Sequence, residues 1–208
     1  MPKFLHSALL KINAILLAAG LSDRMQGPNK LLLDINGESV ISRTYNALIA
    51  SEVGEVVVVT GRDESAIRGV ISLDTRGRFA YNEFFHNGMT SSIQTGLRVI
   101  SKDAALMICL GDMPLLKSTD YDLLIKAFKQ DGSSDKILVP WFKEKRANPV
   151  IFGTDYFEEI MTHTSPNGCA GVIKNHSEKV LNLKVDSERF IRDVDTPGDY
   201  KQLESNAE

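Results

Sequence analysis

The sequence predicts an α/β protein, a three-layer α/β/α sandwich with a mostly parallel sheet, and three observations support this class. Residues 12–18, 55–60 and 104–110 form short, nearly continuous apolar runs, which are typical of strands that helices cover on both faces. The segments between these runs carry apolar residues at helical spacing. Strands and helices therefore alternate along the chain, as they do around a parallel sheet.

Three helices are predicted from apolar stripes. The stripes consist of Ile41, Tyr45, Leu48 and Ile49; of Ile93, Leu97 and Ile100; and of Tyr121, Leu124, Ile125 and Phe128. Residues three and four apart lie on one face of a helix, so each stripe gives its helix an apolar side that can pack against the sheet.

The pattern changes after about residue 137. Shorter strand candidates follow at residues 137–140, 149–152 and 180–185. We expect a helix to begin near Thr154 and the sheet to become mixed at this edge. The last helix has a clear start, because Thr196 can cap it, Pro197 suits its first position and Asp199 lies three residues after the cap.

The composition is that of an ordinary globular protein, with 43% hydrophobic and 25% charged residues. A chain of 208 residues without a repeat or a Gly-, Pro- or Ser-rich linker is expected to form a single domain over residues 1–208. The net charge of −3 argues against a nucleic-acid partner, since such domains usually carry a basic patch.

The apolar stretch 14–21 is neither a signal peptide nor a membrane span by our interpretation. It is far shorter than the ~20 residues that cross a bilayer, and Lys11 and Asn13 interrupt the region before it. Cys109 and Cys169 lack the spacing of a zinc site, so we expect reduced, buried thiols and a cytoplasmic protein without a membrane partner.

The loop after the first strand suits phosphate binding. The small side chains of Ala18, Ala19 and Gly20 allow backbone amides to approach a ligand, while Arg24 and Lys30 supply positive charge. The loop lacks both the GxxxxGK[ST] of P-loop enzymes and the GxGxxG of dinucleotide folds. The alternative is a mobile loop with two solvated cations.

Four sequence blocks carry a family resemblance. They are LAAGLSDRMQGPNKLLL at residues 17–33, NEFFHNGMTSSIQTGL at 82–97, LGDMP at 110–114 and DVDTPGDY at 193–200. Together they resemble the nucleotidyltransferases that activate molybdopterin or sugar phosphates, most closely the molybdenum cofactor cytidylyltransferases.

This resemblance implies a Rossmann-like fold of the glycosyltransferase A type. It also implies transfer of CMP from CTP to the phosphate of a molybdopterin-type acceptor, with release of pyrophosphate. Mg²⁺ or Mn²⁺ would assist the reaction, since a cation offsets charge on the triphosphate. A molybdoenzyme or its chaperone would be a further partner.

The resemblance also assigns the site. Catalytic roles fall to Lys30, Arg24 and Asp112, and metal binding falls to Asp112 and Asp195. Nucleotide binding falls to Leu17, Ala18, Ala19, Gly20, Ser22, Arg24, Lys30, Asn82, Gly88 and Ser92.

Each assignment has a structural alternative. Asp112 would be a turn aspartate and Asp195 a carboxylate stabilised by a helix dipole. Asp193 lies close enough in sequence to be confused with Asp195. Either Ser91 or Ser92 would cap the helix that follows.

Ala19 bears on the base, and two further sequence elements bear on the acceptor. Ala19 favours CTP, because similar enzymes that use CTP tend to have alanine where those that make guanine dinucleotides have glycine. On the acceptor side, the Gly-His-Pro and GDxGAR-like elements of the family are replaced by Ala147-Asn148-Pro149 and by PNGCAG at residues 166–171. The alternatives are therefore nucleotidyl transfer to a sugar or polyol phosphate, or a non-catalytic protein that holds a nucleotide or the cofactor for a partner.

Overall fold

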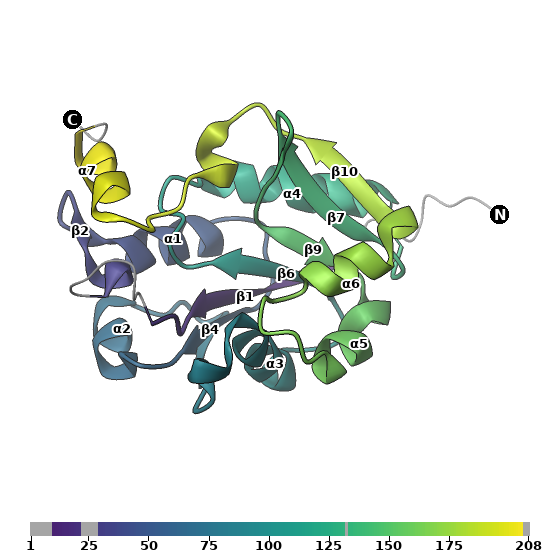
Figure 1. The fold of residues 1–208 in the computed structure, drawn as a ribbon, viewed down its shortest axis with the longest axis horizontal. Coiled ribbons are helices and arrows are strands. Elements are labelled where there is room, and N and C mark those ends of the chain that lie inside the picture. The colour runs from purple at the N-terminus through teal and green to yellow at the C-terminus, as the bar shows by residue number, and fades with distance from the viewer. Residues whose placement is uncertain (1–9, 22–28, 132, 206–208) are drawn as a thin grey trace.

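The computed structural model describes residues 10–21, 29–131 and 133–205, and within these ranges an eight-stranded sheet forms the centre of the protein (Figure 1). The strands are β1 (Ile12–Ala18), β4 (Val56–Thr60), β5 (Gly77–Tyr81), β6 (Ala105–Leu110), β7 (Ile137–Phe142), β8 (Lys145–Arg146), β9 (Val150–Phe152) and β10 (Val180–Lys184). Their order is β10-β7-β9-β6-β1-β4-β5, and β8 pairs with β7. A separate hairpin joins β2 (Asp34–Ile35) to β3 (Glu38–Ser39).

The helices are α1 (Val40–Ile49), α2 (Glu64–Val70), α3 (Met89–Val99), α4 (Ser118–Asp131), α5 (Phe157–Thr162), α6 (Ala170–Asn175) and α7 (Pro197–Ser205). Short 3₁₀ helices include η4 (Lys30–Leu32), η5 (Phe85–Asn87), η6 (Thr154–Tyr156) and η8 (Glu188–Ile191). The three predicted apolar stripes lie on α1, α3 and α4, although Ile100 follows the end of α3.

The sheet is mostly parallel, as predicted. β1 lies inside the sheet, parallel to its neighbours β4 and β6, so that Leu17 stands beside Val59 and Leu110. The sheet is also mixed, because β9 runs antiparallel to β6 and β7. We expected the mixed part at an edge, whereas β9 lies between β6 and β7 and the parallel strand β10 forms the edge.

Two apolar cores cover the two faces of the sheet. Alternate residues of β1 such as Ala14 and Leu16 pack in one core with α1 and α4, while Ile15 packs in the other with α3, α5 and α6. Figure 1 shows these helix groups on opposite sides of the strands. The predicted three-layer sandwich is therefore confirmed.

The last helix begins as predicted. The Thr196 hydroxyl accepts a hydrogen bond from the backbone N–H of Asp199 at 3.2 Å, and the Asp199 carboxylate accepts one from the backbone N–H of Thr196 at 2.7 Å. This reciprocal pair is a capping box. It fixes the point at which the chain leaves the segment 193–195 and enters α7.

Candidate active site

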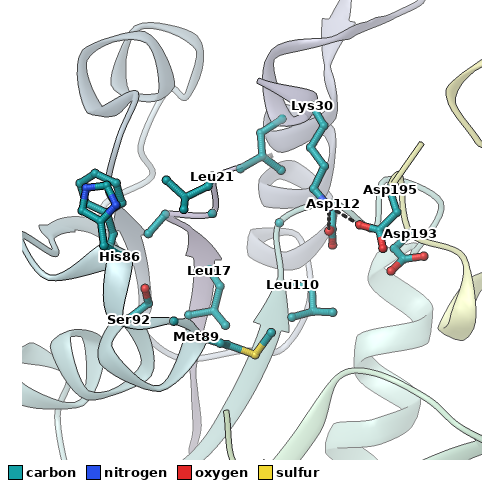
Figure 2. Close-up of a pocket in the computed structure, with 16 residues that line it drawn as sticks. Leu17, Leu21, Lys30, His86, Met89, Ser92, Leu110, Asp112, Asp193 and Asp195 are labelled. Atoms are coloured by element: carbon teal, nitrogen blue, oxygen red, sulfur yellow. Dashed lines mark hydrogen bonds and ion pairs between the residues drawn. The ribbon is translucent and has the colours of Figure 1, made fainter. Parts of the chain in front are cut away.

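A cavity of about 510 Å³ opens at the carboxyl ends of β1 and β6 (Figure 2). Five segments form its wall: the loop after β1, η4, the loop that leads into α3, the end of β6 and the segment before α7. In open α/β sheets this end of the strands is where ligands bind. The fold therefore places one pocket where four separated sequence blocks converge.

The end of β6 is fixed by a close backbone contact. The N–H of Gly111 donates to the carbonyl of Leu17 at 3.0 Å, and the Thr44 hydroxyl donates to the Gly111 carbonyl at 3.1 Å. A Cβ atom on Gly111 would lie 2.6 Å from the Leu17 oxygen, which is too close for any side chain. Glycine at this position therefore lets β1 and β6 meet and sets the start of Asp112.

The segment before α7 is joined to the end of β6 by its backbone. The N–H of Val194 donates to the carbonyl of Asp112 at 2.9 Å, and the Val194 side chain is fully buried in the core. The neighbouring Asp193 and Asp195 line the cavity instead. One oxygen from each of Asp112, Asp193 and Asp195 lies within 4.8 Å of the others, and we call these three residues the acidic cluster.

Asp193 was not among the residues assigned to the metal. The spacing of DVDTP could have revealed it, because a buried valine between two aspartates places both carboxylates on the side away from the core. Sequence reasoning thus found two members of the acidic cluster and identified the third only as a neighbour.

Lys30, the first residue of η4, extends its side chain into the acidic cluster. Its Nζ donates to Asp112 Oδ2 and to Asp195 Oδ1, each at 2.5 Å, as Figure 2 shows. The exposed fractions of the Lys30, Asp112 and Asp195 side chains are 14%, 15% and 23%. These ion pairs are therefore largely shielded from solvent and from screening by salt.

The backbone beside Lys30 is held on both sides. Asn29 is buried; its Oδ1 accepts a hydrogen bond from the N–H of Leu31 at 3.0 Å, and its Nδ2 donates to Asp63 Oδ2 at 2.8 Å. The Leu31 side chain is buried in the core. Asn29 therefore caps η4 and attaches it to the start of α2, which directs Lys30 toward Asp112.

Burial and the neighbouring carboxylates have opposite effects on the pKa of Lys30 and the same effect on the pKa of Asp193. Burial disfavours the ammonium of Lys30, but Asp112 and then Asp195 outweigh it and raise the pKa of Lys30 above its ordinary value. Burial, together with the charges of Asp112 and Asp195, raises the pKa of the Asp193 carboxyl. Among the described residues of the cluster, one ammonium thus faces three carboxyl groups.

The acidic cluster fits a divalent cation. Asp112 Oδ1 is buried and has no hydrogen-bond partner among the residues that the structure describes. An unpartnered carboxylate oxygen inside a protein is costly, and Mg²⁺ and Mn²⁺ favour carboxylate oxygens combined with water and phosphate. The donor atoms and their spacing therefore suit the ion that the family resemblance implies.

The opposite wall is built around the start of α3. Gly88 has a φ of 90°, and a Cβ atom there would lie 2.6 Å from the Pro166 carbonyl oxygen, so this turn requires glycine. Asn82 is buried behind the wall, where its Nδ2 donates to Ser91 Oγ at 2.9 Å and to Ser92 Oγ at 3.0 Å. Asn82 thus connects the end of β5 to α3, and Ser92 lines the cavity.

The predicted nucleotide-binding residues fall into three groups. Those that line the cavity are Leu17, Ala19, Gly20, Lys30, Gly88 and Ser92. Ala18 and Asn82 are buried beside it, with exposed fractions of 3% and 1%. Ser22 and Arg24 lie outside the described residues. The cavity wall also contains Phe85, which we did not predict, and His86, which we interpreted from the sequence as a surface or core histidine; their ring centroids are 4.0 Å apart.

The two altered family elements serve packing. Ala147 is buried, the Asn148–Pro149 peptide is cis, and the N–H of Asn148 donates to the Phe190 carbonyl at 3.0 Å. In the second element, the N–H of Gly168 donates to Thr90 Oγ1 at 3.0 Å. Neither element contributes a residue to the described wall of the cavity.

Both cysteines are buried, as predicted. Burial raises the pKa of Cys169 to about 12 and that of Cys109 further. Among the described residues, no helix is long and apolar enough to cross a membrane.

Three curated proteins of similar sequence are named probable molybdenum cofactor guanylyltransferase, and two of them show the range of the match. The one from Natronomonas pharaonis is 31% identical over 199 residues, which are 90% of this chain and 94% of that protein. The one from Methanosarcina acetivorans is 27% identical over 143 residues, which are 66% of this chain but only 61% of that protein.

A solved structure has the same fold. The crystal structure of Rv0371c from Mycobacterium tuberculosis H37Rv superposes with a TM-score of 0.82 at 24% identity, and covers 94% of this chain and 98% of that one. A second structure of the same protein is described as a complex with manganese, with a TM-score of 0.72 and the same identity and coverage. The nucleotidyltransferase fold is confirmed by a further neighbour, a nucleotidyl transferase from Methanothermobacter thermautotrophicus, with a TM-score of 0.78 at 19% identity and coverage of 95% of this chain and 97% of that one.

The family can be identified directly. Residues 14–180, which include the first strand, Lys30 and Asp112, match the MobA-like NTP transferase domain. This match spans most of the chain and agrees with the fold and the pocket described above, so the chain belongs to the MobA-like NTP transferase family.

Proposed function

We propose that this protein transfers CMP from CTP to the terminal phosphate of a molybdopterin-type acceptor and releases pyrophosphate. The observation that carries the proposal is the contact of Lys30 with Asp112 and Asp195 at the edge of the cavity. It combines a cation for phosphates with carboxylates for a metal ion in one pocket at the carboxyl ends of the strands. The names of the two relatives support molybdopterin as the acceptor.

In the proposed reaction, an oxygen of the acceptor phosphate attacks the α-phosphorus of CTP in line. The bond from the α-phosphorus to the bridging oxygen breaks, and pyrophosphate leaves with the bonding electrons. Asp112 and Asp195, with Asp193 beside them, would hold a Mg²⁺ or Mn²⁺ ion that offsets the charge of the triphosphate. No covalent enzyme intermediate is required.

The residues of the chain position and neutralise the reactants. The amides that follow β1 at Ala19 and Gly20 would donate to phosphate oxygens, because their small side chains leave the backbone accessible. Lys30 would contact the triphosphate, together with Arg24. Gly88 and Ser92 would form the wall for the ribose and base. Catalysis would then depend on orientation and on fixed charges.

The choice of CTP rests on Ala19. Its side chain is buried, and a Cβ atom on the neighbouring Gly61 would lie 2.9 Å from the Ala19 methyl group. The methyl group therefore sits in a packed wall where little adjustment is available, which we propose disfavours the larger purine ring. Because the two relatives are named guanylyltransferases, GTP is the competing triphosphate to test.

The test measures pyrophosphate release from each of the four triphosphates, with Mg²⁺ and either molybdopterin or a sugar or polyol phosphate as acceptor. We expect the highest kcat/KM with CTP and molybdopterin. The Asp112→Asn variant should lose at least about 100-fold in kcat, because a charge that stabilises the transition state is removed. Asp155→Asn, which changes an exposed carboxyl outside the pocket, is the matched control.

The other outcomes distinguish the alternatives. Turnover only with a sugar or polyol phosphate would replace molybdopterin as the acceptor, and turnover with GTP alone would replace CTP. Tight nucleotide binding without turnover on any acceptor would support a non-catalytic carrier. Normal turnover in the Asp112→Asn variant would exclude the assigned role of the carboxylate.

A further inference from the structure

We infer that Lys30 is a displaceable cation: without nucleotide its ammonium neutralises the carboxylates of the metal site, and it leaves them for the triphosphate. The protein would then bind a free divalent cation poorly and take the preformed complex of cation and nucleoside triphosphate. This inference rests on the proposed function, because it assumes that the metal ion and the triphosphate share this pocket.

The position of the ammonium carries the inference. Nζ lies 2.5 Å from one oxygen of Asp112 and 2.5 Å from one oxygen of Asp195, so it occupies the gap between the two carboxylates. In Figure 2 the Lys30 side chain runs along the wall opposite His86, with its amino end against these two residues. The Asp112 oxygen that Lys30 does not contact is the buried Oδ1, which has no hydrogen-bond partner within residues 10–21, 29–131 and 133–205.

The contacts around Lys30 hold its backbone in place but leave its side chain free to change conformation. Asn29 and Leu31 are both buried, and the hydrogen bonds of Asn29 to Leu31 and Asp63 hold η4 in place. The lysine side chain has four flexible methylene groups that end in a point charge, so the ammonium can be redirected without moving η4. Lys30 itself lines the cavity, which gives its amino group access to a bound triphosphate.

The charges of the cluster explain why exchange requires both ligands. One ammonium already offsets part of the charge of Asp112, Asp193 and Asp195, and it would repel a second cation brought to the same oxygens. A triphosphate supplies new oxygens for the ammonium at the moment that the carboxylates receive the metal ion. Lys30 therefore couples the two binding events, and the coupling must be reciprocal.

The experiment measures Mn²⁺ binding without nucleotide, by isothermal titration calorimetry and by electron paramagnetic resonance of free Mn²⁺. We expect Lys30→Met to bind Mn²⁺ at least about fivefold more tightly than the wild type, which is the lower end of usual coupling factors. Lys30→Arg keeps the charge and should remain near the wild-type Kd. Lys129→Met removes a half-buried lysine of α4 that pairs with Glu52 away from the cavity, and should leave the Kd unchanged.

Two further measurements keep the test decisive. Lys30→Gln removes the charge but retains a hydrogen-bond donor, and replaces Lys30→Met if that variant does not fold. Mn²⁺ should also raise the Tm of the neutral variants more than that of the wild type, because tighter binding to the native state stabilises it more. A neutral variant that binds Mn²⁺ no more tightly than the wild type would overturn the inference.

The result is separable from the test of the proposed function. Pyrophosphate release is measured on the wild type, whereas the displaceable cation is measured by Mn²⁺ affinity of the variants. Tighter Mn²⁺ binding by Lys30→Met in a protein without turnover would support the role of Lys30 and remove the enzymatic proposal. Turnover by the wild type with unchanged Mn²⁺ binding by the variants would do the reverse.

Discussion

Replacing Arg189 by methionine should destabilise the protein strongly, in a way that depends on pH. Arg189 lies in η8, and its Nε and Nη2 donate to Asp120 Oδ2 and Oδ1, each at 2.8 Å. Asp120 lies in the first turn of α4 and also accepts the N–H of Lys117 at 2.9 Å. The exposed fraction of its side chain is only 8%, against 34% for Arg189. The variant would leave a buried carboxylate with one of these three hydrogen bonds.

The magnitude follows from this burial. Removing one partner of a fully buried ion pair costs about 3–5 kcal/mol, because the other charge stays behind. One third of Arg189 is exposed, so water replaces part of the interaction and we expect about 2–3 kcal/mol at pH 7. For a protein of this size that corresponds to a Tm lower by roughly 4–12 °C.

The dependence on pH has a definite sign. Burial alone would raise the pKa of Asp120, but Arg189 and the backbone of Lys117 outweigh it and lower the pKa below its ordinary value. A carboxyl group with a lowered pKa in the native state stabilises the fold above its unfolded pKa of about 4, and this stability is lost as the pH falls through the native pKa. The difference between wild type and variant should therefore shrink below about pH 4.

Urea unfolding followed by circular dichroism at a series of pH values measures both effects. Lys129→Met, which breaks the pair with Glu52, is the control and should cost less than about 1 kcal/mol at every pH, because the Glu52 carboxylate is 70% exposed. A loss below about 1 kcal/mol for Arg189→Met at pH 7 would refute the reasoning. So would a loss that stays the same down to the lowest pH at which both proteins fold.

Three further predictions concern the pocket and its surroundings. Gly111→Ala should cost about 1–3 kcal/mol in thermal unfolding and lower kcat, because its Cβ would lie 2.6 Å from the Leu17 oxygen; a wild-type Tm would contradict this. Asn29→Ala should cost about 1–2 kcal/mol through the lost cap of η4 and the lost bond to Asp63, measured by urea unfolding. A cost near zero would show that η4 is held by other contacts. Cys169 should resist DTNB at pH 8 until denaturant is added, because burial raises its pKa to about 12 and removes the thiolate; rapid labelling of the folded protein would speak against that burial.

The sequence predicts the central strands well because their environment is simple. The run at residues 12–18 coincides with β1, since a strand covered on both faces needs apolar residues at nearly every position. The stripes of α1, α3 and α4 are equally clear, because one side of each helix packs on the sheet. These elements are defined by local patterns.

The sequence did not predict the elements β5 and α2 or the position of β9 in the sheet, and none of these has such a pattern. β5 is an edge strand of five residues that begins with Gly77, and only Ala80 among them is fully buried. The place of β9 between β6 and β7 depends on contacts between distant segments, which periodicity does not encode. α2 has a single buried residue, Ile67, and therefore no apolar stripe.

In the candidate site, too, the sequence predicts some features and not others. Asp112 could be placed at the end of a strand from the apolar run before it, and Lys30 from the loop that follows β1. The direct contact of Lys30 with Asp112 and Asp195 could not, because it requires side chains from three distant segments to converge. The cavity wall at Phe85 and His86 was likewise hidden in a block that the sequence marks only as a whole.

The hydrogen bond from Val194 to the carbonyl of Asp112 has a consequence for biosynthesis. A nascent chain emerges from the ribosome with its N-terminus first, so Lys30 and Asp112 are made long before Asp193 and Asp195. Until the later segment attaches to β6, the earlier residues hold only part of the acidic cluster. The complete set of carboxylates can therefore form only after the segment 193–195 has been made, when the central strands are already available to fold.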